Sequence, residues 1–306
     1  MKSSNIIIDI GANYGGFSLE IAKRNPNKVV YAIEAEPSLA KKLELEATEK
    51  QLKNHKVENF AISDTEGIAD FFISELGDHG TSSLLRFSKE NIINDEYWAG
   101  RQDLQHTKKT SVHTKRLDTF LDEIIFNDID FIKIDIQGLD LVALKSAGKY
   151  LSKIKAGMLE MPAVCEKSLY ENNYDDLRIA LNYLYENSFI VYGIKPNDEA
   201  SNEFNIFFYR NGENIERIEN DLNIRNFLYY DGKNYWHAPS YKLENPEQNI
   251  INLNLTLDEE NKKYNDLKYR FNEEKEKNNE LNEKLNNIKN SFFMKSLSKL
   301  GLFKNI

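Results

Sequence analysis

The chain has 306 residues, and 41% of them are hydrophobic, which is enough for one catalytic domain of roughly 200–250 residues with an appendage. Its formal net charge of −9 argues against a nucleic-acid partner, because a nucleic-acid groove needs a basic face. The single cysteine rules out a disulfide within the chain, and no apolar run reaches the length of about 18 residues that spans a membrane. We therefore expect a cytoplasmic protein.

Strand-like and helix-like segments alternate from residue 5 to about residue 210. Seven apolar runs predict strands, at residues 6–10, 29–34, 57–62, 131–135, 156–161, 190–194 and 205–209. Helical patterns separate them, at 17–24, 37–51 and 174–186. This alternation predicts an α/β fold of Rossmann-like type, with a mostly parallel seven-stranded sheet and helices on both faces, over residues 1–212.

An insertion interrupts this rhythm between residues 63 and 128. Residues 68–74 and 110–115 look like two extra strands, and the segment between them is polar and aromatic with poor periodicity. A long irregular segment in a compact domain is often functional. We interpret residues 75–115 as a lid over the substrate, with a mobile surface loop as the alternative.

The composition changes after a connecting segment at residues 213–245. In the tail, residues 246–306, apolar side chains recur in steps of three and four, which is typical of a coiled-coil seam. The thirteen seam positions hold Ile250, Leu253, Leu257, Glu260, Tyr264, Leu267, Phe271, Glu274, Asn278, Leu281, Leu285, Ile288 and Phe292. A buried Asn278 favours a parallel dimer, so the tail predicts a homodimer or higher oligomer. The alternatives are a helix packed on its own domain and a charged tail.

The end of the tail, residues 291–304, mixes bulky apolar groups with positive charges only. Such a segment is typical of peripheral contact with an anionic membrane surface. A capping contact within the oligomer is the alternative.

The first strand runs into a glycine turn and then a helix. Glycines let a backbone approach a ligand, and a helix N-terminus offers free N–H groups to an anion. A dinucleotide site needs glycine at the second position of Gly-x-Gly-x-x-Gly, but Asn13 stands there between Gly11 and Gly16. The turn suits a nucleoside that carries an amino acid. Asp9 would face its ammonium group, and the amides of residues 13–15, including Tyr14 and Gly15, its carboxylate.

Two more acids follow the next two strands. Glu34 ends the second strand, where a carboxylate can accept hydrogen bonds from both hydroxyls of a ribose. Asp64 follows the third strand and could accept the amino group of adenine, with Ile62 and Ser63 beside the ring. Each acid alone could instead be a helix cap or a turn residue.

These motifs resemble the FkbM family of S-adenosylmethionine-dependent methyltransferases. The matching segments are residues 8–15, 31–34, 61–64, 81–84, 115–121 and, most specifically, 130–140. The resemblance implies a class I methyltransferase fold, S-adenosylmethionine as cofactor with S-adenosylhomocysteine as product, and methylation of a hydroxyl on a sugar or similar small molecule. The family more often has Glu-Gly-x-Glu where this chain has Gln137-Gly138-Leu139-Asp140.

A hydroxyl acceptor must lose a proton, so a base near its oxygen is expected. Asp135 ends the fourth strand beside the expected methyl group and is the first candidate, and it is also a candidate cofactor contact. Lys133 points to the same face, and an ion pair between the two would make Asp135 too acidic to be a good base. His79, in a polar loop, is the second candidate, with His106 and His113 as alternatives.

Glu160 ends the fifth strand and is the third candidate. With Asp135 and Asp140 it could form an oxygen-ligand metal site, but we favour hydrogen bonding without a metal. The sequence thus predicts an O-methyltransferase for a sugar or sugar-containing molecule, in bacterial surface polysaccharide biosynthesis. A nicotinamide-dependent oxidoreductase and a non-catalytic scaffold that acts through its coiled coil are the alternatives.

Overall fold

The computed structural model describes residues 4–75, 79–198, 200–224 and 246–301. It divides into two units, Met1–Trp236 and His237–Ile306, and each is described by itself. The first unit contains the α/β domain. No described helix is long and apolar enough to cross a membrane.

Seven strands form the main sheet, in the order β3-β2-β1-β7-β8-β10-β9. They are β1 (Ile6–Ile10), β2 (Val29–Ile33), β3 (His55–Glu58), β7 (Ile129–Ile134), β8 (Ala156–Pro162), β9 (Phe189–Pro196) and β10 (Glu203–Arg210). Neighbours pair in parallel except β10, which runs antiparallel to both β8 and β9. The predicted mostly parallel, seven-stranded sheet of Rossmann-like type is confirmed.

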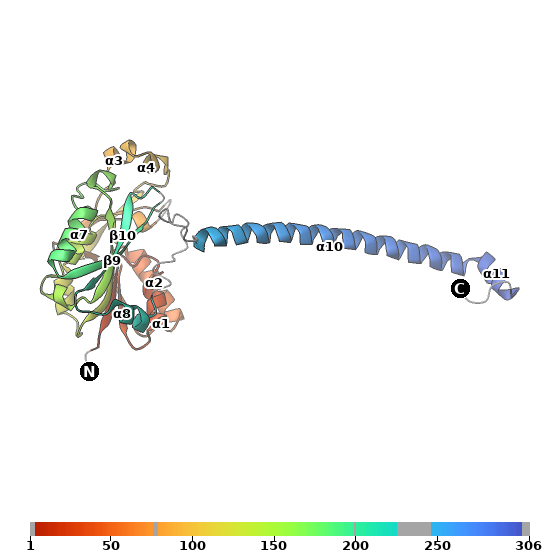
Figure 1. Ribbon diagram of the computed structural model, residues 1–306, viewed down its shortest axis with the longest axis horizontal. Helices are drawn as coiled ribbons and strands as arrows, with labels where there is room; N and C mark the ends of the chain where they lie inside the picture. The colour runs from red at the N-terminus through yellow and green to blue at the C-terminus, as the bar shows by residue number, and fades with distance from the viewer. Residues whose placement is uncertain (1–3, 76–78, 199, 225–245, 302–306) are drawn as a thin grey trace. The chain divides into compact units, whose positions relative to one another are not determined.

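Helices cover both faces of this sheet, as Figure 1 shows for α1, α2 and α8 on one side and α7 on the other. They are α1 (Ser18–Arg24), α2 (Pro37–Glu49), α5 (Leu117–Asp122), α6 (Asp140–Lys145), α7 (Leu177–Glu186) and α8 (Ile215–Leu222). Side chains alternate along β1: Ile7 packs with α1 and α8, while Ile8 packs with α5, α6 and α7. Helix α8 thus extends the domain's core into the segment that the sequence assigned to a linker.

The predicted third strand, residues 57–62, is wrong as a single strand. After β3 the chain leaves the main sheet, because the side chain of Asn59 donates hydrogen bonds to the carbonyl oxygens of Glu34 (2.8 Å) and Ala35 (3.2 Å). Strand β4 (Ala61–Ile62) then pairs in parallel with β6 (Lys108–Lys115) in a second sheet. The residues after β4 therefore do not follow the edge of the main sheet.

The insertion is built around this second sheet, in the order β4-β6-β5, with β5 at Gly67–Ile73. Both extra strands expected from the sequence are thus present. Between them lie the single turn η1 (His79–Thr81) and the short helices α3 (Lys89–Asn94) and α4 (Glu96–Gly100). Trp98 of α4 packs with Phe87, Leu104 and Tyr170 in a separate buried cluster. This cluster gives the insertion an apolar core that its sequence periodicity did not reveal.

The C-terminal unit contains α10 (Pro246–Asn290) and α11 (Phe292–Lys299). The apolar seam side chains described on α10 are exposed, from Leu285 at 47% to Leu267 at 68%. On α11, Phe292 and Phe293 are exposed beside Lys295 and Lys299. The helix is therefore as expected, while the oligomer and the membrane contact stay predictions.

Candidate active site

A cavity of about 610 Å³ opens at the carboxyl ends of β1, β2 and β7. Strand order reverses between β1 and β7, and open α/β sheets bind ligands in the crevice at such a point. The volume lies within the range of roughly 300–1,000 Å³ found for small-molecule sites. The sequence-predicted residues that line it are Asp9, Gly11, Asn13, Tyr14, Glu34, Ile62, His79 and Asp135.

The turn after β1 presses its backbone against the end of β7. Gly11 has a φ of +80°, and a Cβ placed on it would lie 1.8 Å from the carbonyl oxygen of Asp135. Asn13 also has a positive φ, of 51°, a conformation that asparagine tolerates better than most residues. Gly15 packs on Leu43 and Leu19 and does not line the cavity. Gly15 thus shapes the turn and is not placed to touch a ligand there.

Gly11→Ala should lower the free energy of unfolding by about 3 kcal/mol or more, because the new methyl group meets backbone at a positive φ. Gly16→Ala is the matched control, since a Cβ on Gly16 would meet nothing within 4 Å. Urea unfolding of both variants measures the effect. Equal stability of the two would contradict this account of the turn.

Asp9 carries a buried carboxylate aimed at this cavity. Its side chain is 1% exposed, and neither oxygen has a hydrogen-bond partner among the described residues. Burial raises the pKa of Asp9 to about 6, although the nearby Lys133 ammonium lowers it. Such a group is costly to bury unless a donor or a cation meets it. The site therefore offers a buried carboxylate without a hydrogen-bond donor among the described residues, where a ligand ammonium would be stabilised.

Glu34 lies at the adjacent strand end and is held by backbone. Its Oε2 accepts a hydrogen bond from the amide of Asn13 at 2.7 Å, and its Oε1 accepts one from the amide of Glu36 at 2.8 Å. Burial raises the pKa of Glu34 to about 7, against the lowering effect of these two amides. Each carboxylate oxygen keeps a second lone pair. Glu34 is thus a fixed acceptor for two neighbouring hydroxyls, while Glu36 caps α2 through the amide of Leu39.

Lys133 stands between two carboxylates. Its Nζ lies 2.9 Å from Oδ2 of Asp135 and 3.7 Å from Oδ1 of Asp9, its neighbour in register on β1. Burial would raise the pKa of Asp135, but the Lys133 ammonium outweighs it and holds that pKa below the ordinary value. A carboxylate of lowered pKa is a weak base. This is the ion pair that the sequence allowed, and it favours a positioning role for Asp135 over proton removal.

Gln137 joins the strand ends of β7 and β8. Its Nε2 donates to Asp135 at 3.0 Å and to Glu160 at 2.7 Å, and its Oε1 accepts from the hydroxyl of Tyr170 at 2.7 Å. Glu160 also accepts from Asn197 and does not line the cavity. Glu160 therefore lies behind Gln137, where it positions this amide instead of facing a ligand.

Asp140 begins α6 and is buried at the same strand ends. Its carboxylate accepts long hydrogen bonds from the amides of Ile136 (3.4 Å) and Glu160 (3.4 Å), and burial raises its pKa well above the ordinary value. Among the described residues, no three His, Cys, Asp or Glu side chains are grouped as metal ligands. The hydrogen bonds of Asp140 thus hold the backbone after β7 and near the end of β8 in place.

The three histidines of the insertion lie in different surroundings. His79 lines the cavity, contacts Tyr14 edge to face with ring centroids 5.7 Å apart, and has a buried Nδ1 without a hydrogen-bond partner among the described residues. His106 stacks on Phe87 at 3.7 Å, outside the lining, and burial lowers its pKa to about 4. His113 is exposed on β6. The structure places His79 at the site, and His106 and His113 away from it.

The structure does not bring the predicted adenine contacts together. Ile62 lines the cavity, but Ser63 and Asp64 do not, and Asp64 is exposed. The cause is the departure of β4 from the main sheet, which turns the following residues outward. Phe60 and Phe71 line the cavity with Ile62 and provide an apolar surface for a ring in place of an acid.

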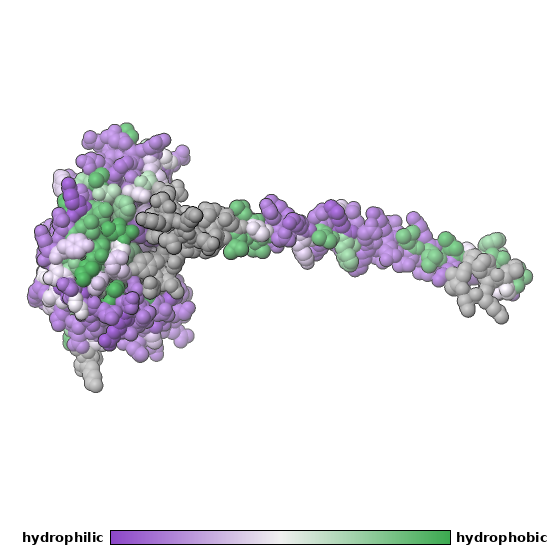
Figure 2. Space-filling model, in the orientation of Figure 1, coloured by the Kyte–Doolittle hydropathy of each residue, from purple (hydrophilic) through white to green (hydrophobic). Residues whose placement is uncertain are grey.

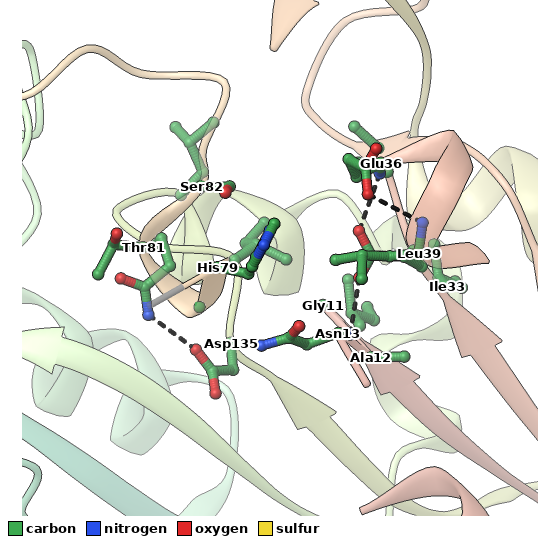
Figure 3. A pocket seen from close by; sticks show the side chains of 18 of the residues that line it. Gly11, Ala12, Asn13, Ile33, Glu36, Leu39, His79, Thr81, Ser82 and Asp135 are labelled. Carbon is green, nitrogen blue, oxygen red and sulfur yellow. Dashed lines mark hydrogen bonds between the residues drawn. The ribbon is translucent and has the colours of Figure 1, made fainter. Parts of the chain in front are cut away.

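Sequence reasoning missed the lining residues that come from two other segments. Tyr97 and Arg101 come from the insertion, and Asn197 and Asp198 come from the β9–β10 connection. Figure 3 shows His79, Thr81 and Ser82 across the pocket from Asp135 and Asn13. Because β10 is antiparallel, its first residues lie at the same edge of the sheet as the carboxyl ends of β1, β2 and β7. The sequence alone did not indicate this strand direction.

Residues 9–191 match the methyltransferase FkbM domain, which is more than half of the chain. The chain therefore belongs to the FkbM methyltransferase family, and its methyl donor is S-adenosylmethionine.

The AMB antimetabolite synthetase AmbE of Pseudomonas aeruginosa is 26% identical in an alignment of 184 residues, and the match covers 51% of this chain and 8% of that protein. The chain thus spans less than a tenth of that relative. Two solved structures are similar. Precorrin-6y C5,15-methyltransferase of Geobacter metallireducens has 12% identity, coverage of 69% of this chain and 82% of that chain, and a TM-score of 0.36. Aeropyrum pernix fibrillarin with natively bound S-adenosyl-L-methionine has 8% identity, coverage of 68% of this chain and 67% of that chain, and a TM-score of 0.39.

The residues at the cavity fit this cofactor. The carboxylate of Asp9, which lacks a hydrogen-bond partner among the described residues, matches the ammonium of its methionine part, and Glu34 matches the two ribose hydroxyls. A side chain at Gly11 would block the backbone approach that shapes the turn. Phe60, Phe71 and Ile62 would contact the purine. The fit rests on charge complementarity and shape, both present in the chain itself.

Proposed function

We propose that this chain transfers a methyl group from S-adenosylmethionine to a hydroxyl oxygen of a sugar or a sugar-containing small molecule, in the biosynthesis of bacterial surface polysaccharide. The observation that carries the O-methyl assignment is the imidazole of His79, whose Nδ1 is buried at the cavity without a hydrogen-bond partner among the described residues. A neutral imidazole is suited to accept a proton near physiological pH.

The rest of the lining supports a polyhydroxylated acceptor. Thr81, Ser82 and Asn197 add neutral polar groups, and Glu203 and Arg101 add charged ones, so many hydroxyls could find partners. Tyr97 adds aromatic surface of the kind that contacts a sugar ring. The similarity to an antimetabolite synthetase agrees with a small-molecule acceptor.

The chain's own residues position the reactants and remove one proton. The bound cofactor supplies an electrophilic methyl group. Asp9 and Glu34 would fix it, and Asp135, held by Lys133 and Gln137, would border the reacting centre. His79 would take the proton of the acceptor hydroxyl as its oxygen forms the new bond to carbon, and most of the rate enhancement would come from this alignment.

Neither alternative gains support from the site. Asn13 stands where a dinucleotide needs glycine, and the matched family is one of methyltransferases, which opposes a nicotinamide oxidoreductase. A scaffold would not need a buried Asp9 carboxylate without a hydrogen-bond donor at a cavity, since such a group destabilises the fold without a ligand.

The proposal is tested with radiolabelled S-adenosylmethionine, the full chain and a panel of oligosaccharides and glycan extracts. We expect label in a product that survives mild alkali, as a methyl ether does. Alkali-labile label would indicate a methyl ester instead. Absence of transfer to all acceptors, with cofactor binding intact, would overturn the sugar assignment alone.

Cofactor affinity should depend on pH between about 5 and 7.5. The raised pKa values of Asp9, about 6, and Glu34, about 7, mean that both become protonated as the pH falls through this window. A protonated Asp9 no longer attracts the ammonium, so affinity should fall by about 10-fold or more, and binding should release protons. Titration calorimetry in buffers of different ionisation enthalpy measures both, and constant affinity would contradict the assignment.

A further inference from the structure

The charged residues that border the apolar positions of α10 are all bases. When the seam residues are numbered a and d of a heptad, seven of the flanking e and g positions between 253 and 290 hold bases, at Lys263, Lys268, Arg270, Lys275, Lys277, Lys284 and Lys289. The other four hold the neutral residues Asn254, Thr256, Asn261 and Asn282. The acids of this stretch occupy no e or g position: Glu260 and Glu274 stand at d positions of the seam, and the others lie outside it, at Asp258, Glu259, Asp266, Glu273, Glu276, Glu280 and Glu283. Charge is therefore segregated around the seam.

Within the C-terminal unit, the described apolar residues of the seam are exposed. Leu257 is 59% exposed, Phe271 67% and Leu281 63%. Figure 2 shows apolar patches separated by hydrophilic stretches along the visible face of this helix. Burying one such side chain contributes roughly 1.5–3 kcal/mol, so the repeated exposure favours an occupant.

The period of the seam favours a helix as that occupant. A seven-residue repeat drifts by about 20° per heptad around a straight α-helix. Over the five heptads from Leu253 to Ile288 the stripe winds through about 100°, so a flat membrane would meet only part of it. A partner helix that supercoils around α10 would follow all of it.

The bases at e and g oppose pairing with a second copy. In a parallel pair each g position meets the e position five residues later on the other helix. Lys263 would then face Lys268, Arg270 would face Lys275, and Lys284 would face Lys289. An antiparallel pair would also bring base against base. The bonds of Lys263 to Glu260 and Arg270 to Asp266 lie within one helix and are exposed, so they offset little.

We propose that α10 binds an amphipathic helix of a different protein, one with apolar residues at a and d and Glu or Asp at e and g. Such a partner buries the apolar positions of the seam and pairs its acids with the basic borders. The homodimer expected from the seam alone is the competing outcome. The proposal does not depend on the acceptor or on the cofactor site.

The first test uses the full chain and two designed peptides with the same apolar seam, one with Glu and one with Lys at every e and g position. By fluorescence anisotropy we expect at least about 100-fold tighter binding of the acidic peptide, weakening as salt rises. Sedimentation should show the chain alone as a monomer at the same concentration. Equal binding of both peptides, or a stable homodimer, would overturn the proposal.

A charge-reversed variant provides the second test. Lys263→Glu, Arg270→Glu and Lys284→Glu together should lose the preference for the acidic peptide and turn three repulsive pairs into attractive ones, so this variant should dimerise. Lys262→Glu, at an outer f position, is the matched control and should behave as wild type. Binding to phosphatidylserine vesicles that is equal in both variants, without peptide binding, would instead assign the seam to a lipid surface.

Discussion

Asp9→Asn should raise the melting temperature of the cofactor-free chain at pH 8 and abolish most of its stabilisation by S-adenosylmethionine. A buried carboxyl whose pKa rises from 3.8 to about 6 on folding destabilises the folded state by at most about 3 kcal/mol above that pH. The neutral amide removes this cost. It also removes the partner of the cofactor's ammonium, so affinity should fall by about 10–100-fold.

The pH dependence separates this explanation from a general packing effect. The pKa of Asp9 is higher in the folded state, so its cost is absent below about pH 4, grows as the pH rises, and is complete above about pH 6. The difference in melting temperature between the two proteins should follow that course. A difference in melting temperature that is constant across pH, or a less stable variant at pH 8, would show that the ionised carboxylate of Asp9 does not destabilise the folded state.

His79→Ala should lower kcat by about 100–1,000-fold while the affinity for S-adenosylmethionine changes little. The expected loss is that of a general base, and the cofactor's proposed contacts are with Asp9 and Glu34 instead. Added imidazole should restore part of the rate, because it can occupy the space left by the side chain and accept the same proton. Steady-state kinetics with an acceptor identified in the radiolabel transfer assay measures both effects.

Two further variants make this test specific. His113→Ala, on the exposed side of β6, should keep the wild-type rate. Asp135→Asn should weaken cofactor binding, because it breaks the ion pair with Lys133, and imidazole should not rescue it. A rate for His79→Ala within threefold of wild type would assign proton removal to another group or to water.

The main sheet could be predicted because its strands are short apolar runs between helices. Ile7 and Ile8 of β1 face opposite layers, and both are buried, so the run is continuous and easily recognised. The end of β3 could not be predicted, since it depends on the side chain of Asn59 donating hydrogen bonds to the carbonyl oxygens of Glu34 and Ala35, just after β2. That tertiary contact moves β4 into another sheet and explains the misplacement of Asp64.

Part of the site could also be predicted. Asp9 and Glu34 end adjacent parallel strands, so the sequence alone places them together at one edge. The spacing of Lys133 and Asp135 indicated an ion pair, but the sequence was equally compatible with Asp135 as a general base. The bridge formed by Gln137 between β7 and β8 was not foreseeable, because it needs the packing of Tyr170 from a distant loop.

The most direct test of the central claim is a calorimetric titration of the full wild-type chain with S-adenosylmethionine at pH 7.5, beside Asp9→Asn. The account predicts saturable binding of one molecule per chain to the wild type and a strongly weakened titration for the variant. No heat of binding to the wild type, or equal affinity of the two proteins, would contradict it.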